Sequence, residues 1–197
     1  MNPSSTERQD KLPPLLVMLF LWFRTHAAPL ELILRKPGTA GRAYFSWASF
    51  FSVFWVAVFA ACVAVNDRQM HAMCVFWIAF MVMAFVHAIA GARARKRGYA
   101  CHSGYMGDSW IGVIWPWLLR RKGGWWIKSC VEPVLMFFGS IPVFLLCPPL
   151  GLYMLVGAFA LLGITGYIEE RDKRMAEAMN DAVIEQRHLH DLYRRNQ

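Results

Sequence analysis

The sequence predicts an all-α integral membrane protein with four transmembrane helices arranged as two hairpins. Of its 197 residues, 57% are hydrophobic and 17% are charged, whereas soluble domains average about 45–50% and about 25%. Several stretches approach the roughly 20 apolar residues that cross a hydrocarbon core. The net charge of +8 fits basic loops between spans. These observations exclude a disordered chain and argue against a compact soluble enzyme.

The first hairpin is predicted over residues 43–92. Ala43–Val65 contains no charged residue and is long enough to span. A polar break, Asn66–Gln69, comes after it. His71–Ala92 is the second span, and its ionisable residues are His71 at one end and His87 inside.

The second hairpin is predicted over residues 127–168. Ile127–Leu146 contains Lys128, Glu132 and two prolines, which spanning helices tolerate when neighbours satisfy the freed backbone groups. Cys147–Pro149 forms the turn, and Leu150–Ile168 is a span without charge.

The N-terminal tail, residues 1–42, is predicted to lie in the cytoplasm. Its apolar stretch Pro13–Phe23 is too short to span, and Arg24 and Glu31 interrupt the apolar residues after it. We expect an interfacial helix on the membrane surface. A tilted or re-entrant segment and a cleaved signal peptide are the alternatives.

The loop of residues 93–126 is basic and rich in tryptophan. Trp110–Leu118 is apolar but short, and Arg120, Arg121 and Lys122 come directly after it. Tryptophan beside basic residues suits the headgroup layer, which predicts a second interfacial helix. The loop could equally plug the mouth of the bundle, and the two interpretations are compatible.

The basic residues predict the orientation. Twenty of the 21 Lys and Arg fall on one side: they lie in the N-terminal tail, in the basic loop with Lys128 at its edge, and in the C-terminal tail. Only Arg68 lies on the other side. The positive-inside rule then places both termini in the cytoplasm, in a plasma or inner membrane. A three-span topology would put the basic loop or the basic tail outside.

Small residues at helical spacing predict close contacts between spans, because small side chains let helix backbones approach in lipid. These contacts are expected mainly within one chain, with homo-oligomer contacts as the alternative. The residues concerned are Ala84, Ala88, Ala92, Gly157, Ala160, Gly163 and Gly166.

The C-terminal tail, residues 169–197, is predicted to be an amphipathic cytoplasmic helix. Glu169/Lys173 and Glu170/Arg174 are favourable i,i+4 pairs. A seam with coiled-coil spacing offers either a docking face for a partner or a face that folds back on the protein's own loop. The seam consists of Met175, Met179, Ala182, Gln186, Leu189 and Tyr193.

Two groups of residues are candidates for chemistry. His87 and Glu132 lie at similar shallow depths and are predicted to pair, as a structural contact or as a proton relay. The glycine-rich loop at residues 98–110 contains His102, Tyr105 and Asp108, and we expect it to contact partners. It matches no catalytic motif. The five cysteines show no CxxC spacing, so we expect reduced thiols, no metal site and no cofactor.

The function expected from these features is that of a non-enzymatic subunit or scaffold of a larger membrane assembly, such as secretion, conjugation, transport or defence machinery. Its expected partners are an anionic inner leaflet, other membrane or cytoplasmic proteins and a possible second copy, with no specific nucleic acid. One alternative is a small oligomeric transporter or channel that uses His87 and Glu132. A membrane-embedded enzyme that uses His102 and Asp108 is the other.

Overall fold

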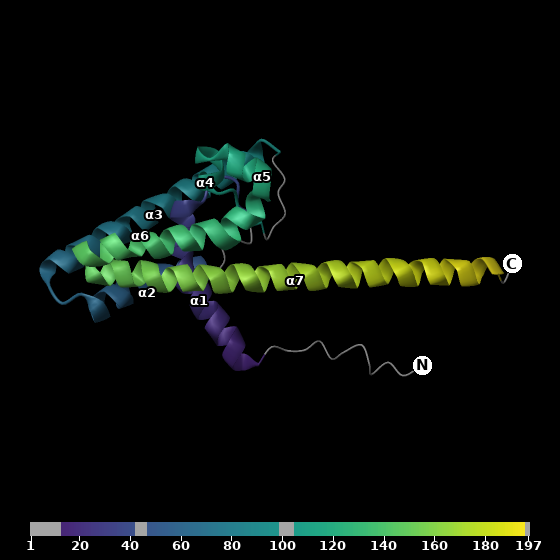
Figure 1. The fold of residues 1–197 in the computed structure, drawn as a ribbon, viewed down its shortest axis with the longest axis horizontal. Helices are drawn as coiled ribbons and strands as arrows, with labels where there is room; N and C mark the ends of the chain where they lie inside the picture. Colours follow the sequence, from purple (N-terminus) through teal and green to yellow (C-terminus); the bar gives the residue numbers. More distant parts are fainter. Residues whose placement is uncertain (1–12, 42–46, 99–104, 196–197) are drawn as a thin grey trace.

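The computed structural model describes residues 13–41, 47–98 and 105–195, and this part of the chain is almost entirely helical (Figure 1). A π-helix, labelled η3, lies between two α-helices. The elements in chain order are α1 (Pro14–Leu34), α2 (Trp47–Val63), α3 (Asp67–Lys96), α4 (Trp110–Ile114), α5 (Pro116–Trp126), η3 (Ile127–Val131), α6 (Glu132–Leu146) and α7 (Pro148–Arg195).

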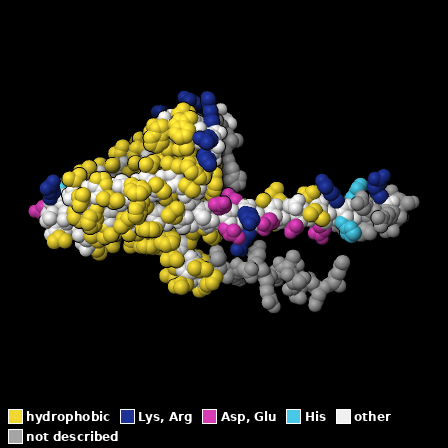
Figure 2. All heavy atoms as spheres, viewed as in Figure 1, with side chains coloured by type: hydrophobic (Ala, Val, Ile, Leu, Met, Phe, Trp, Pro, Cys, Tyr) yellow, Lys and Arg dark blue, Asp and Glu magenta, His cyan; other side chains and the backbone are white. Residues whose placement is uncertain are grey.

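Within the described residues, four helical stretches are long and apolar enough to cross a membrane. They are Pro14–Leu34, Asp67–Lys96, Pro116–Leu146 and Pro148–His188. Figure 2 shows hydrophobic side chains over most of the visible face of the body, with charged side chains at its ends and along the projecting helix. The fold is therefore that of a multipass α-helical membrane protein.

The predicted spans and the long apolar helices coincide at three places out of four. The spans expected at 71–92, 127–146 and 150–168 lie in α3, in η3 with α6, and in α7. The span expected at 43–65 corresponds to the shorter α2. α1 is the fourth long apolar helix, where the sequence indicated a surface helix. The expected position of this segment on the membrane surface stays a prediction.

The second half of α1 is packed inside the bundle. All seven residues from His26 to Leu32 are buried, and α1 contacts α2, α3 and α7. In Figure 1, α1 crosses the other helices obliquely. A Cβ atom added at Gly157 of α7 would overlap the Leu30 side chain, so glycine is what lets the two helices approach here.

Two tight turns lie at the same end of the bundle, on the left in Figure 1. The side chain of Asn66 accepts a hydrogen bond from the Gln69 backbone N–H and caps the start of α3. The α6–α7 turn is closed by Gly151, which sits against the backbone of Phe144. α2 packs on α3 and α6 packs on α7, as two hairpins require.

The interior contains two clusters of buried apolar residues. One joins α1 and α7 to the segments 40–41 and 105–107, and the other joins α1, α2, α3 and α7. The first contains Ala27, Ala40, Met106, Ala160, Leu161 and Ile164. The second contains Leu30, Val56, Ala60, Met73 and Tyr153.

The small-residue stripes have different surroundings. In α7, Gly157 and Gly163 face side chains of α1, and Ala160 is fully buried. Nothing lies within 4 Å of a Cβ atom added at Gly166. In α3, Ala88 is exposed. The stripe in α7 therefore makes a helix contact, while in the α3 stripe Ala84 and Ala92 are only half-buried.

The basic loop folds into α4 and α5 at the opposite end from the two turns. Gly123 has a φ of 83° and separates two helical segments within α5. The π-helix η3 then leads into α6. Trp115 and Trp117 are exposed, as a position in the headgroup layer would require. Their contact with lipid remains a prediction.

α7 is a single helix of 48 residues that starts in the bundle and continues well beyond it (Figure 1). At about 1.5 Å per residue, the part after Ile168 extends about 40 Å. Every side chain described in that part is exposed. The tail predicted at 169–197 is thus a direct continuation of the last apolar helix.

Candidate functional site at the basic end of the bundle

The end of the bundle where α3 ends and α6 begins, here called the basic end, contains two buried ion pairs. Nη1 of Arg35, the C-cap residue that follows α1, lies 2.6 Å from Oε1 of Glu132 at the start of α6, and both side chains are fully buried. Nη1 of Arg24 lies 2.8 Å from Oε2 of Glu31, two turns further along α1. The Arg35–Glu132 ion pair therefore joins the C-terminal end of α1 to the start of α6.

The Arg35–Glu132 pair is incompletely hydrogen-bonded. Nε and Nη2 of Arg35 and Oε2 of Glu132 are buried and have no hydrogen-bond partner among the described residues. Buried charges that are not fully hydrogen-bonded add little net stability over an apolar pair of the same shape. The pair is therefore better understood as fixing how α1 meets α6 than as a large source of stability.

An aromatic cluster around His26 joins three helices. Nε1 of Trp55 donates to Nδ1 of His26 at 2.9 Å, and Nε2 of His26 lies 2.9 Å from the Tyr153 carbonyl oxygen. Since Nδ1 accepts, the ring carries its proton on Nε2 and donates to that carbonyl. The Tyr153 hydroxyl donates back to the His26 carbonyl at 2.9 Å, and the two rings stack 4.2 Å apart. The cluster locks α1 between α2 and α7.

The structure gives His87 and Glu132, which the sequence suggests as a pair, separate partners at the end of α1. Both residues are buried, but Nε2 of His87 donates to the Leu32 carbonyl at 3.0 Å, while Glu132 pairs with Arg35. Their partners lie one turn apart at the end of α1. The two residues therefore meet the same segment rather than each other, and that segment belongs to a region whose sequence indicated a surface helix.

The glycine-rich loop is held against the turn that follows α1. The Lys36 N–H donates to the Asp108 carbonyl at 2.8 Å, and the Asp108 N–H donates to Oγ1 of Thr39 at 2.8 Å. The Tyr105 hydroxyl donates to the Asp108 carboxylate at 2.6 Å. The structure thus brings Tyr105 and Asp108 together, and His102 lies outside the described residues.

Lys128 is a buried cation that in the sequence stands out only as an irregularity of the third span. It is 5% exposed, and its Nζ lies 4.4 Å from the centroid of the Tyr105 ring. A cation over an aromatic face is stabilised by the ring quadrupole. Lys128 therefore fastens η3, which leads into α6, to the loop that contains Tyr105.

The residues that sequence reasoning missed share a recognisable spacing. Arg24, Glu31 and Arg35 are seven and four residues apart, so they lie on one face of a helix with alternating charge. In the sequence they read as interruptions of an apolar stretch. Charged residues that share one face of an apolar helix can instead indicate that the helix lies inside a bundle, where these residues form ion pairs.

The seam of the C-terminal helix is exposed along its described length. Met175, Met179 and Tyr193 are 49%, 72% and 66% exposed, and Ala182 is also exposed. The side chain of Leu189 lies outside the description. Of the predicted i,i+4 pairs, Glu170 and Arg174 form an ion pair of 3.0 Å.

Within the described ranges, no three His, Cys, Asp or Glu side chains are grouped as a metal site requires. Cys62, Cys74 and Cys130 are exposed and Cys147 is buried, all as free thiols. Cys101 falls outside those ranges.

Comparisons with family models, with curated proteins and with solved structures found no match to this chain. The class of protein is therefore the one that its helices define, a multipass membrane protein with a long helical extension.

Proposed function

We propose that the protein is a non-enzymatic subunit of a membrane assembly, in which the bundle is the anchor and the extension of α7 is a docking rod for another polypeptide. The observation that carries this proposal is the length of α7, whose final 40 Å or so leaves the bundle with all its described side chains exposed. We infer that the partner contributes an amphipathic helix that packs along the seam.

Two physical arguments support a partner for this helix. Isolated helices are marginally stable in water, and most helices in proteins depend on packing of an apolar face. Here that face includes Met179 and Tyr193, while Glu177 and Asp181 lie on the opposite face, so the extension is amphipathic. A helix that stays extended with this face uncovered fits docking better than folding back.

His87 and Glu132 support the same proposal rather than the transporter alternative. Both bind the end of α1 through Leu32 and Arg35, a contact that holds helices together. Asp108, which the enzyme alternative uses, has its carboxylate engaged by Tyr105. These contacts support structural roles for His87, Glu132 and Asp108, on which the two alternatives depend.

Photo-crosslinking in native membranes tests the docking rod. A photoreactive phenylalanine analogue replaces Met179 on the seam, and in a matched control it replaces Glu177 on the polar face of the same helical turn. We expect a discrete crosslinked species from position 179 and a much weaker one from 177. Equal crosslinking from the two positions, or none from 179, would refute docking along the seam. A species of twice the chain mass would identify the partner as a second copy.

The proposed orientation places α4, α5 and the extension of α7 in the cytoplasm, because the basic residues gather there. In a background without cysteine, Asn66→Cys in the α2–α3 turn should react with a membrane-impermeant maleimide in intact cells. Asn180→Cys on α7 should react only after permeabilisation. The reverse pattern would overturn the orientation and would place the docking rod outside the cell.

A further inference from the structure

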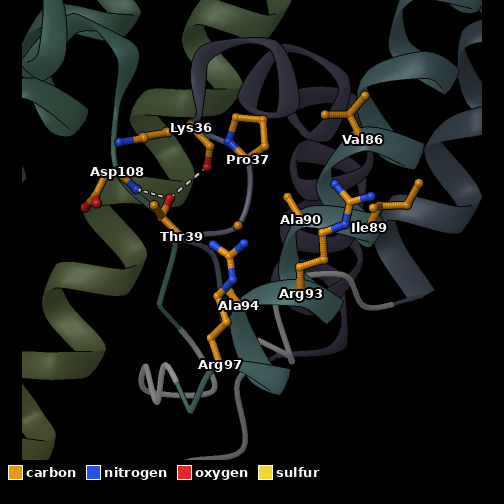
Figure 3. A pocket seen from close by; sticks show the side chains of 11 residues that line it. Lys36, Pro37, Thr39, Val86, Ile89, Ala90, Arg93, Ala94, Arg97 and Asp108 are labelled. Carbon is orange, nitrogen blue, oxygen red and sulfur yellow. Dashed lines mark hydrogen bonds between the residues drawn. The ribbon is translucent and has the colours of Figure 1, made fainter.

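A pocket of about 720 Å³ opens at the basic end, between the turn that follows α1 and the last turns of α3 (Figure 3). This volume falls within the roughly 300–1,000 Å³ range typical of ligand sites. Its lining has three parts: a polar turn at Lys36–Thr39, an apolar wall on α3 and a basic rim.

The rim of the pocket carries an excess of positive charge. Lys36, Arg93 and Arg97 line the pocket with a single acid, Asp108, whose carboxylate accepts a hydrogen bond from Tyr105. None of these three cations belongs to the ion pairs found among the described residues. In Figure 3, the Arg97 side chain extends toward Thr39, and the Arg93 side chain runs beside Ile89. Guanidinium groups bind phosphate oxygens with paired, charge-assisted hydrogen bonds.

The apolar wall continues out of the pocket along α3. Val86 and Ile89 line the pocket, and the arginines of the rim follow them on the same helical face. Further back on this face, Val75, Ile78 and Val82 are all more than half exposed. Since α3 is one of the membrane-length apolar helices, this face offers an acyl chain a continuous apolar path that ends at two arginines.

Hydrogen bonds of Thr39 hold the polar turn at Lys36–Thr39 in place. Oγ1 of Thr39 donates to the Lys36 carbonyl and accepts from the Asp108 N–H, each at 2.8 Å. Gly38 has a φ of 84°, and a Cβ atom added there would lie 3.3 Å from Ala90. Glycine therefore sets how closely the turn approaches α3, and the hydrogen bonds of Thr39 fix the conformation of the turn.

We propose that this pocket binds one anionic phospholipid, with its headgroup phosphate between Arg93 and Arg97 and an acyl chain along the exposed face of α3. A phosphate-bearing ligand matches the rim, and a lipid also matches the apolar wall, which a water-soluble phosphate would leave unused. The net positive rim selects an anionic headgroup over a zwitterionic one. This site is separate from the docking rod on α7 and goes beyond the proposed function.

The test measures lipid binding to the full-length protein, purified in detergent and delipidated. Fluorescent phosphatidylglycerol is titrated against wild type, against the rim variant Arg93→Gln/Arg97→Gln, and against Arg187→Gln/Arg194→Gln as a control that removes the same charge from exposed positions on the extension of α7. Val86→Trp fills the apolar wall and leaves every charge in place. We expect the rim variant, which removes two charge-assisted contacts, to weaken binding by more than about tenfold. Val86→Trp, which fills the space proposed for the acyl chain, should weaken it by about tenfold. The control should change it by less than about twofold.

The other outcomes overturn the proposal. Equal loss in the rim variant and the control would show diffuse attraction to basic surface. Equal affinity for phosphatidylcholine would remove the selection for an anionic headgroup. Displacement of the lipid by glycerol phosphate at matching concentration would assign the pocket to a soluble phosphate. If the rim variant elutes as an aggregate, the Val86→Trp variant still tests the proposal. Unchanged binding by monodisperse Val86→Trp would refute the placement of an acyl chain along α3.

Discussion

The ion pair between Arg35 and Glu132 gives the sharpest prediction about how the bundle holds together. At 2.6 Å and an effective dielectric constant of about 20, the Coulomb attraction is about 6 kcal/mol. Desolvation of each ion costs several kcal/mol, so the pair is close to neutral against an apolar pair. Glu132→Gln, however, leaves the fully buried Arg35 without a countercharge and should lower the free energy of unfolding by about 3–5 kcal/mol.

Thermal unfolding in detergent, followed by tryptophan fluorescence, measures this loss. A decrease of about 4 kcal/mol corresponds to a fall in Tm of roughly 10 °C for a chain of this size. The matched control is Glu170→Gln, which removes the partner of Arg174 from an exposed pair and should cost about 0.3–0.5 kcal/mol.

The double variant Arg35→Met/Glu132→Met separates the two effects. Because it removes both charges and keeps apolar bulk, it should recover to within about 1 kcal/mol of wild type. If Glu132→Gln unfolds within about 2 °C of wild type, the reasoning about an uncompensated charge is refuted. If the double variant is as unstable as the single one, the loss has a cause other than the buried Arg35 charge.

Two further predictions concern the contacts that hold α1 in the bundle. Gly157→Val should lower stability by about 1–3 kcal/mol because its side chain would overlap Leu30, whereas Gly166→Val, in open space, should melt close to wild type. Tyr153→Phe removes the hydroxyl that donates to the His26 carbonyl and should cost about 0.5–1.5 kcal/mol in the same unfolding assay, because that oxygen lies inside α1 and keeps its helical hydrogen bond. A melting temperature unchanged by Tyr153→Phe would contradict the role given to this hydrogen bond.

The features that the sequence predicted well were local. The charge-free stretch Leu150–Ile168 and the polar break at Asn66–Gln69 report directly on helix and turn, and the structure has α7 and the α2–α3 turn at those places. The helical tail was equally predictable from its i,i+4 pairs, of which Glu170–Arg174 is observed.

The sequence could not predict which side chains pair with each other inside the fold. Arg35 and Glu132 are 97 residues apart, and no local pattern connects them. The charges of α1 suggested contact with water, whereas folding pairs Glu31 with Arg24 inside the bundle. Likewise, small residues such as Ala88 suit either a helix contact or a lipid-facing surface, and spacing alone does not distinguish these surroundings.

The continuity of α7 also has a mechanical consequence. The helix contains no proline after Pro149, so the segment inside the bundle and the segment outside form one stiff lever. A tilt of about 5° where α7 packs on α1 would move its far end by about 3–4 Å, given an outer arm of about 40 Å. Tension in the membrane and a force applied to the far end of α7 would then both act on the same angle, the tilt of α7 against α1.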